Sequence, residues 1–173
     1  MKHIIFLDID GVLNSDSWNA AHRKERDDGI LIDRDKVALL AGLIRKTDAG
    51  MVLHSGWRFW FDNHRKPIRQ EAARLTEMFC LEGLTLYDVT PDFSTDEIRR
   101  TKKFSLVKAR EILSWLEMHP ETERWIVLDD LDLHNDMVHR HQVQTDQAVG
   151  LTAQEIRLAE DMLLNDRNLP YKQ

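Results

Sequence analysis

The sequence predicts an α/β fold with a doubly wound, mainly parallel, Rossmann-like sheet of about five strands. Two observations predict it. Short apolar runs alternate along the chain with longer stretches of helical periodicity, which is typical of βαβ units. Two of the apolar runs, 4–7 and 125–128, are followed at once by carboxylates. Because right-handed crossovers bring the carboxyl ends of parallel strands to one edge, where such sheets bind ligands, we expect a functional site at that edge.

The first strand is expected at residues 4–7, an apolar run rich in Ile and Phe that suits burial on both faces. The run ends in Asp8, Ile9, Asp10 and Gly11. Positions two apart in an extended backbone share a face, so both aspartates can face one pocket, and the glycine permits a sharp turn. Two carboxylates this close repel unless a divalent cation lies between them or one keeps a proton. The alternative is a strand that ends in an ordinary acidic turn.

Residues 14–32 show no sustained period, and we expect them to form a flap over the end of the first strand. An ordinary polar surface loop is the alternative. From Asp33, which suits an N-cap, apolar residues at helical spacing predict a helix that Gly50 ends. A second strand is predicted at 51–54, and its end carries the polar and glycine residues of 55–58. The ends of the first two strands are therefore expected to meet.

The middle of the chain continues the alternation of helices and strands. Pro67 suits the first turn of a helix whose amphipathic face continues to Gly83. The weakly alternating run 84–89 predicts a third strand. Residues 90–104 are expected to form a loop, and helical spacing predicts a helix over about 105–120.

The apolar run 125–128 predicts a fourth strand, and it again ends in acid, at Asp129 and Asp130. The short, polar run 141–145 predicts a fifth strand at the edge of the sheet. After it, Thr152 and Glu155 form a capping box for a last helix, and the tail from residue 165 is expected to fray.

Composition and length indicate one globular domain over residues 1–173. The net charge of −6 argues against a general polyanion-binding surface, although it leaves a local basic patch open. A single cysteine, Cys80, cannot form an internal disulfide. The run of four apolar residues after the first three residues is too short for a signal peptide. No apolar run approaches the ~20 residues that span a bilayer. We therefore expect a cytoplasmic protein without a membrane segment.

The motifs, in this order, resemble those of the haloacid dehalogenase (HAD) superfamily of aspartate-nucleophile phosphohydrolases, over nearly the whole chain. The matching segments are Asp8-Ile9-Asp10-Gly11-Val12 for the first motif, Ser55 for the second, Lys108 for the third and Asp129-Asp130 for the fourth. More narrowly, the sequences of segments 7–14, 55–58, 125–130 and 150–152 resemble those of a compact branch that includes HAD domains associated with RNA-repair proteins. Gly56 departs from the Ser-Ser-Trp-Arg of that branch, which removes a hydroxyl but leaves a backbone N–H. No long insertion follows the second motif, so we expect no large cap and an open site.

The resemblance implies a Mg²⁺-dependent phosphomonoester hydrolase that works through an aspartyl-phosphate. Asp8 is the expected nucleophile, and Asp10 is expected to protonate the leaving oxygen, then activate water, with its backbone carbonyl on the metal. The expected catalytic residues are Asp8, Asp10, Ser55 and Lys108; the substrate-binding residues are Ser55, Gly56, Arg58 and Lys108; the metal-binding residues are Asp8, Asp10, Asp129 and Asp130. Whether Asp130 is a direct ligand or acts through water is left open.

Several of these assignments have alternatives. Lys102 or Lys103 would replace Lys108 if the latter were a solvated helix residue, and a surface ion pair is the alternative to phosphate binding by Arg58. Trp57 or Trp60 is a candidate for stacking on a nucleobase, although core packing explains most buried aromatic residues.

Two other functions remain open, namely a phosphoaspartate signalling receiver and a non-catalytic nucleic-acid-binding or scaffold domain. The position of the Asp8-Ile9-Asp10-Gly11 segment on the first strand, with its partner acid after the fourth, fits the hydrolase order better. The expected partner is a phosphorylated substrate, either a small molecule or a nucleic-acid end. The sequence indicates neither the particular ester nor the oligomeric state.

Overall fold

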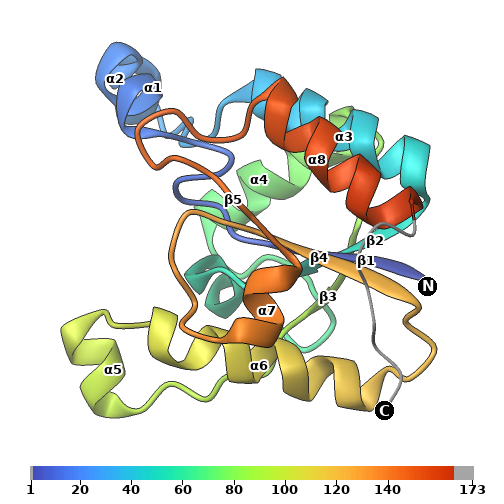
Figure 1. Cartoon of the computed structure of the whole chain (residues 1–173). Helices are drawn as coiled ribbons and strands as arrows, with labels where there is room; N and C mark the ends of the chain where they lie inside the picture. Colours follow the sequence, from blue (N-terminus) through green and yellow to red (C-terminus); the bar gives the residue numbers. More distant parts are fainter. Residues whose placement is uncertain (1, 166–173) are drawn as a thin grey trace.

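The computed structural model describes residues 2–165, which form a sheet with helices packed against both of its faces (Figure 1). The strands are β1 (His3–Leu7), β2 (Ala49–Leu53), β3 (Leu86–Val89), β4 (Arg124–Asp129) and β5 (Gln142–Gln144). All four strand pairs are parallel, and the order across the sheet is β3-β2-β1-β4-β5. The predicted α/β class and doubly wound parallel sheet are confirmed.

The helices connect these strands and cover the sheet. They are α1 (Asp16–Ala21), α2 (Arg23–Asp27), α3 (Arg34–Thr47), α4 (Gln70–Leu81), α5 (Asp96–Thr101), α6 (Ser105–Met118), α7 (Asp136–Arg140) and α8 (Ala153–Leu164), together with the 3-10 turn η1 (Gly56–Trp60). Side chains of α3, α4 and α8 pack against one face, and those of α6 and α7 pack against the other. The sheet is therefore covered on both sides.

The central strand β1 shows why the apolar run predicted a buried strand. Each residue from Ile4 to Leu7 is fully buried. Ile5 and Leu7 face the core beneath α3 and α8, whereas Ile4 and Phe6 face the core above α6. Burial of each such side chain stabilises the fold by roughly 1.5–3 kcal/mol. The end of β1 is consequently held firmly at the middle of the sheet.

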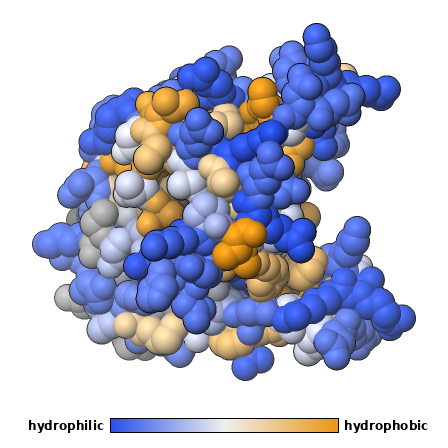
Figure 2. Space-filling view, turned by 180° about the vertical axis from the view of Figure 1, so that it is seen from behind, coloured by the Kyte–Doolittle hydropathy of each residue, from blue (hydrophilic) through white to orange (hydrophobic). Residues whose placement is uncertain are grey.

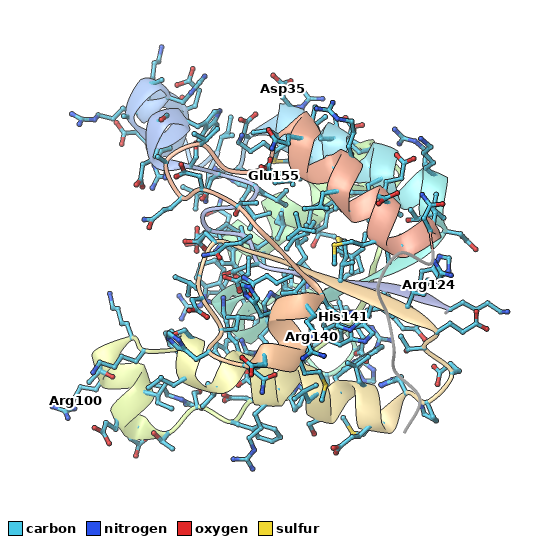
Figure 3. All side chains as sticks on the ribbon, in the orientation of Figure 1. Asp35, Arg100, Arg124, Arg140, His141 and Glu155 are labelled. Carbon is cyan, nitrogen blue, oxygen red and sulfur yellow. The ribbon has the colours of Figure 1, made fainter. Side chains whose placement is uncertain are left out.

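Local capping signals were reliable guides to the helix starts. The Asp33 carboxylate accepts a hydrogen bond from the Asp35 N–H at 3.0 Å, which caps α3. At α8 the predicted capping box is present, with the Thr152 N–H donating to Glu155 at 2.9 Å; Figure 3 labels Glu155 in the first turn of that helix. Both caps depend on side chains within three residues, so tertiary packing is not needed to define them.

Two segments predicted to be irregular contain short helices. Within 14–32 the chain forms α1 and α2, and within 90–104 it forms α5. The Ser15 hydroxyl caps α1 by accepting from the Trp18 N–H at 3.2 Å, and Thr95 caps α5 in the same way. Helices of five or six residues are too short to show an apolar period, which is why the sequence pattern missed them.

Gly50 and Pro67, which were predicted to end one helix and to start another, have other roles in the structure. Gly50 does not end α3 but pairs with Ile4 inside the sheet, because Asp48 adopts the left-handed conformation (φ 51°) that ends the helix first. Pro67 does not start α4, which begins at Gln70. The proline instead forms an antiparallel bridge with Phe61.

The expected fraying of the tail concerns residues that lie outside the described range, apart from Asn165. Over residues 2–165, none of the helices has the length and apolar character needed to cross a membrane.

Candidate active site

The register of the sheet aligns three polar residues at its carboxyl edge. Leu7 of β1 lies opposite Leu53 of β2 and Leu128 of β4. The next residue on each strand is therefore Asp8, His54 or Asp129. The backbone ladder continues past the strand end, because the Asp8 N–H donates to the Leu128 carbonyl at 2.9 Å. The predicted meeting of strand ends is a direct consequence of this register.

Lys108 on α6 joins the two aspartates of this row. Its Nζ donates to Oδ2 of Asp8 and, at 2.7 Å, to Oδ2 of Asp129. All three side chains are almost fully buried. The two alternatives, Lys102 and Lys103, are exposed between α5 and α6. The structure thus brings Lys108, among the three candidate lysines, to the aspartates.

The remaining carboxylate oxygens of the row are held by backbone donors. Oδ1 of Asp8 accepts from the Ile9 N–H, and Oδ1 of Asp129 accepts from the Leu131 N–H, each at 2.8 Å. Such hydrogen bonds favour the ionised form and limit rotation of each side chain. The two carboxylates are therefore oriented before any ligand arrives.

Asp130 completes an acidic cluster, which we define as Asp8, Asp129 and Asp130. One oxygen from each lies within 4.8 Å of the others. Asp130 sits against the turn at Gly11, where an added Cβ would lie 2.5 Å from Asp130 Cγ and where φ is +75°. The glycine is required both by this backbone conformation and by the close approach of the carboxylate.

The pKa values of Asp8 and Asp129 are shifted in opposite directions. Burial and the charge of Asp8 raise the pKa of Asp129 to about 7. Burial is the largest influence on Asp8 and disfavours its ionisation, but the charge and hydrogen bond of Lys108, with smaller contributions from His54 and Ser55, together outweigh burial and hold the pKa of Asp8 below its ordinary value. For Lys108, the two carboxylates outweigh burial and raise the pKa of the ammonium. At neutral pH the structure therefore favours an ionised Asp8 beside a charged lysine.

Asp10 lies outside the acidic cluster. Its side chain is exposed, and its two oxygens accept hydrogen bonds from Asn14 Nδ2 at 2.8 Å and from Trp57 Nε1 at 3.0 Å. The structure thus separates the carboxylates of Asp8 and Asp10 into two environments, one buried against a lysine and one at the surface.

Ser55 and Gly56 follow β2 on the same edge. The Ser55 side chain is buried, accepts from the Trp57 N–H at 3.3 Å and contributes a hydrogen bond that lowers the pKa of Asp8. Gly56 is exposed, and an added Cβ there would have no atom within 4 Å. The second motif is therefore brought to Asp8 through Ser55.

Arg58 is held in a buried ion pair. Its Nη2 contacts both oxygens of Glu111 at 2.9 Å, and its Nη1 donates to the carbonyls of His54 and Ser55. The expected alternative, an ion pair at the surface, is wrong in its location, because Arg58 is only 5% exposed and Glu111 is fully buried. Both terminal nitrogens of the guanidinium are therefore already engaged, Nη1 with the backbone of the second motif and Nη2 with the Glu111 carboxylate.

His54 is a site residue that the sequence reasoning missed. It is fully buried, and its Nε2 lies 3.3 Å from Asp129 Oδ2. Burial and the Lys108 charge lower its pKa to about 3, so the ring is neutral at physiological pH. Its position directly after the second apolar run, level with Asp8, was the signal that could have identified it.

The strand ends lie between two projecting segments, one formed by α1 and α2 and the other by α5 (Figure 1). The space-filling view shows the molecule hollowed between two hydrophilic projections on this side (Figure 2). Arg100 of α5 points outward from the sheet (Figure 3). The carboxyl edge is thus bordered by polar, projecting surface, and Asp8, Lys108 and Asp129 are buried beneath the hollow.

A family model described as "HAD domain in Swiss Army Knife RNA repair proteins" matches residues 4–156. No curated protein and no solved structure matches the chain. The matched range runs from β1 into α8 and includes the acidic cluster, Lys108 and Ser55.

Proposed function

Because the chain belongs to the family of HAD domains in Swiss Army Knife RNA repair proteins, we propose that it is a Mg²⁺-dependent phosphomonoester hydrolase that forms an aspartyl-phosphate on Asp8. Since one fold supports many functions, the proposal depends on the site. The observation that carries it is the buried Lys108 bridge between Asp8 and Asp129 at the ends of two neighbouring strands. A carboxylate held ionised in this way suits a nucleophile.

The charge balance of the acidic cluster fits a divalent cation. Three carboxylates and the single ammonium of Lys108 leave a charge of −2 when all are ionised (−3 + 1 = −2). Oxygen ligands of this kind suit Mg²⁺. Asp8, Asp129, Asp130 and the backbone carbonyl of Asp10 would hold the ion. When bound, Mg²⁺ supplies neutralisation of the nucleophile and of the negative charge on the transferred phosphoryl group.

The chain's own residues divide the reaction into two steps. A carboxylate oxygen of Asp8 attacks phosphorus, and the bond from phosphorus to the ester oxygen breaks as Asp10 gives that oxygen a proton. Asp10 then takes a proton from water, which attacks the same phosphorus. The bond between Asp8 and phosphorus breaks, and inorganic phosphate leaves. Asp8 regains its negative charge, and Asp10 is again protonated.

Ser55, the Gly56 amide and Lys108 are proposed to bind the phosphate oxygens. The proximity of Ser55 and Lys108 to Asp8 supports this assignment. Arg58 is less available to bind phosphate, because its guanidinium already contacts Glu111 and two backbone carbonyls. Phosphate binding by Arg58 would require it to exchange at least one of those contacts.

The substrate is proposed to be a phosphorylated small molecule or a phosphorylated nucleic-acid end, because the hollow between the projections is open (Figure 2). Trp57 is only 5% exposed, so its ring faces are covered and base stacking by it is unfavourable. The half-buried Trp60 remains the candidate for that contact.

Phosphate release from nucleotides, sugar phosphates, phosphopeptides and phosphorylated oligonucleotides tests the proposal. We expect release that requires Mg²⁺ and that Asp8→Asn abolishes, because the amide keeps the shape but cannot form the acyl-phosphate. Circular dichroism provides the control that the variant is folded. A stable phosphoaspartate without turnover would favour a signalling receiver, and ligand binding without release would favour a scaffold.

A further inference from the structure

We infer that Trp57 and Asn14 are positioning residues that hold the Asp10 carboxyl group for proton transfer to the leaving group, an inference that rests on the function proposed above. Asp10 is exposed on the turn after β1, where a short side chain would otherwise sample several rotamers. Here each of its two oxygens has its own donor from a side chain that is at least 95% buried. We call this pair of hydrogen bonds the clamp. It fixes the orientation of a carboxylate that is otherwise exposed to solvent.

Trp57 is a rigid donor. Its indole N–H can only donate, and it reaches Asp10 Oδ2 at 3.0 Å across 47 residues of sequence. The ring is buried and packs on Trp60, with centroids 4.7 Å apart. Because this packing sets the direction of the N–H, the indole determines where Asp10 Oδ2 lies.

Asn14 is an equally constrained donor. Its Nδ2 donates to Asp10 Oδ1 at 2.8 Å and to the Leu31 carbonyl at 3.2 Å, while its Oδ1 accepts from the Gly11 N–H at 3.1 Å. An inverted amide would place oxygen against oxygen at both Asp10 and Leu31 and would leave the Gly11 N–H facing an NH₂ group. The network therefore permits one orientation of the amide, with its nitrogen toward Asp10.

This clamp matters for the chemistry of Asp10 because a general acid must lie within hydrogen-bond reach of the atom it protonates. Displacement of a reacting group by about 1 Å can reduce rates by roughly 100-fold. The same clamp leaves the attack by Asp8 unaffected, since Trp57 and Asn14 donate to Asp10 and to no atom of the acidic cluster among the described hydrogen bonds. The later activation of water by Asp10 is common to all esters and follows release of the leaving group, so it does not enter kcat/KM. In kcat/KM, loss of the clamp should consequently appear only where the leaving group needs a proton.

The test compares two esters of similar shape in the full-length protein with Mg²⁺. Phenyl phosphate has a leaving oxygen that needs protonation, whereas 2,4-dinitrophenyl phosphate releases a stable anion. We expect Trp57→Phe to lower kcat/KM for phenyl phosphate by about 10- to 100-fold and that for the dinitrophenyl ester by less than about 3-fold. Trp115→Phe is the matched control, because it also removes a buried indole N–H that donates to a carboxylate, that of Asp88, outside the site, and should change both esters by the same factor. Equal losses on both esters in a folded Trp57→Phe protein would overturn the inference.

Asn14→Ala is the second variant and serves if Trp57→Phe does not fold. It shares with Trp57→Phe the loss of one donor to Asp10, so it should show the same selective loss on phenyl phosphate. An Asn14→Ala protein that treats both esters alike would contradict the clamp.

A readout that does not depend on turnover is the indole N–H resonance of Trp57 in protein labelled with ¹⁵N-tryptophan, assigned by its absence in Trp57→Phe. Asp10→Ala should shift this resonance, and Asp130→Ala should leave it in place. An unchanged resonance in Asp10→Ala would refute the contact itself. If the wild type released no phosphate from any ester, the proposed function would fail, while the resonance would still report on the clamp.

Discussion

Gly11→Ala tests whether the acidic cluster needs Asp130 in its observed place. The new Cβ would lie 2.5 Å from Asp130 Cγ and 2.7 Å from its Oδ1, whereas carbon atoms in contact are normally about 3.5–4.0 Å apart. Asp130 must therefore move by about 1 Å or rotate away from the cluster. The backbone adds a second cost, since φ is +75° and a left-handed conformation destabilises a non-glycine residue by about 1–2 kcal/mol.

Gly83→Ala separates these two effects. Gly83 has almost the same backbone conformation, with φ +73°, but an added Cβ there would meet no atom within 4 Å. The left-handed backbone alone should cost each variant about 1–2 kcal/mol of unfolding free energy in urea. Only Gly11→Ala should also weaken Mg²⁺ binding, by roughly 10- to 100-fold, which is the usual effect of disturbing groups that orient metal ligands.

Calorimetric titration with Mg²⁺ and the Mg²⁺ dependence of phosphate release measure the second effect. Wild-type Mg²⁺ affinity in a folded Gly11→Ala protein would refute the reasoning, because Asp130 would then contribute nothing to the ion site. The same loss of affinity in Gly83→Ala would also refute it, since general destabilisation would then be the cause.

Three further predictions follow from the buried charges. Glu111→Gln should lower the unfolding free energy by about 3–5 kcal/mol in urea, because it leaves the Arg58 charge buried without its carboxylate; Glu117→Gln, on the exposed side of α6, should have little effect. The pKa of His54 is lowered to about 3, so the stability that its neutral form contributes is complete above pH 6.5 and is lost as the pH falls toward 3. His54→Asn should remove this part of the acid sensitivity, and identical pH profiles of stability in the two proteins would exclude a contribution from His54. The pKa of Asp129 is raised to about 7, so without metal the folded state binds one more proton than the unfolded state between about pH 4 and 7. In chelator the protein should therefore lose stability as the pH rises through that range. Asp129→Asn should show a smaller loss, and an equal loss would contradict the assigned pKa.

Features that depend on neighbouring residues were predictable. The run Ile4 to Leu7 is apolar because both faces of a central parallel strand are buried, so composition alone identifies it. The caps Asp33 and Thr152 act on N–H groups within three residues, so their helix starts were visible in the sequence. The carboxylates after the first and fourth runs were predicted to converge because parallel topology itself brings strand ends together.

Features with weak local signals were predicted less well. Gly50 was expected to end a helix, but Asp48 reverses the chain two residues earlier, and Gly50 enters the sheet opposite Ile4. Pro67 suited a helix start, yet its bridge to Phe61 places it in a turn closed by the Asp62 carboxylate. In each case a nearby residue, Asp48 or Asp62, favoured a different local conformation. Composition alone did not indicate which of the two conformations is more stable.

The sequence by itself determined the sheet, its apolar strands and the acidic character of its carboxyl edge, because burial and capping act over a few residues. The resemblance to the HAD superfamily also predicted Lys108 at that edge. Only the tertiary structure decided how these groups contact one another and which further charged groups join them. Lys108 reaches Asp8 across 100 residues because α6 packs on the sheet with that side chain toward the edge, and Arg58 finds Glu111 across 53 residues for the same reason. His54 joins the site through strand register alone. Partners of this kind are set by how whole elements pack together, a property that no local pattern of residue types encodes.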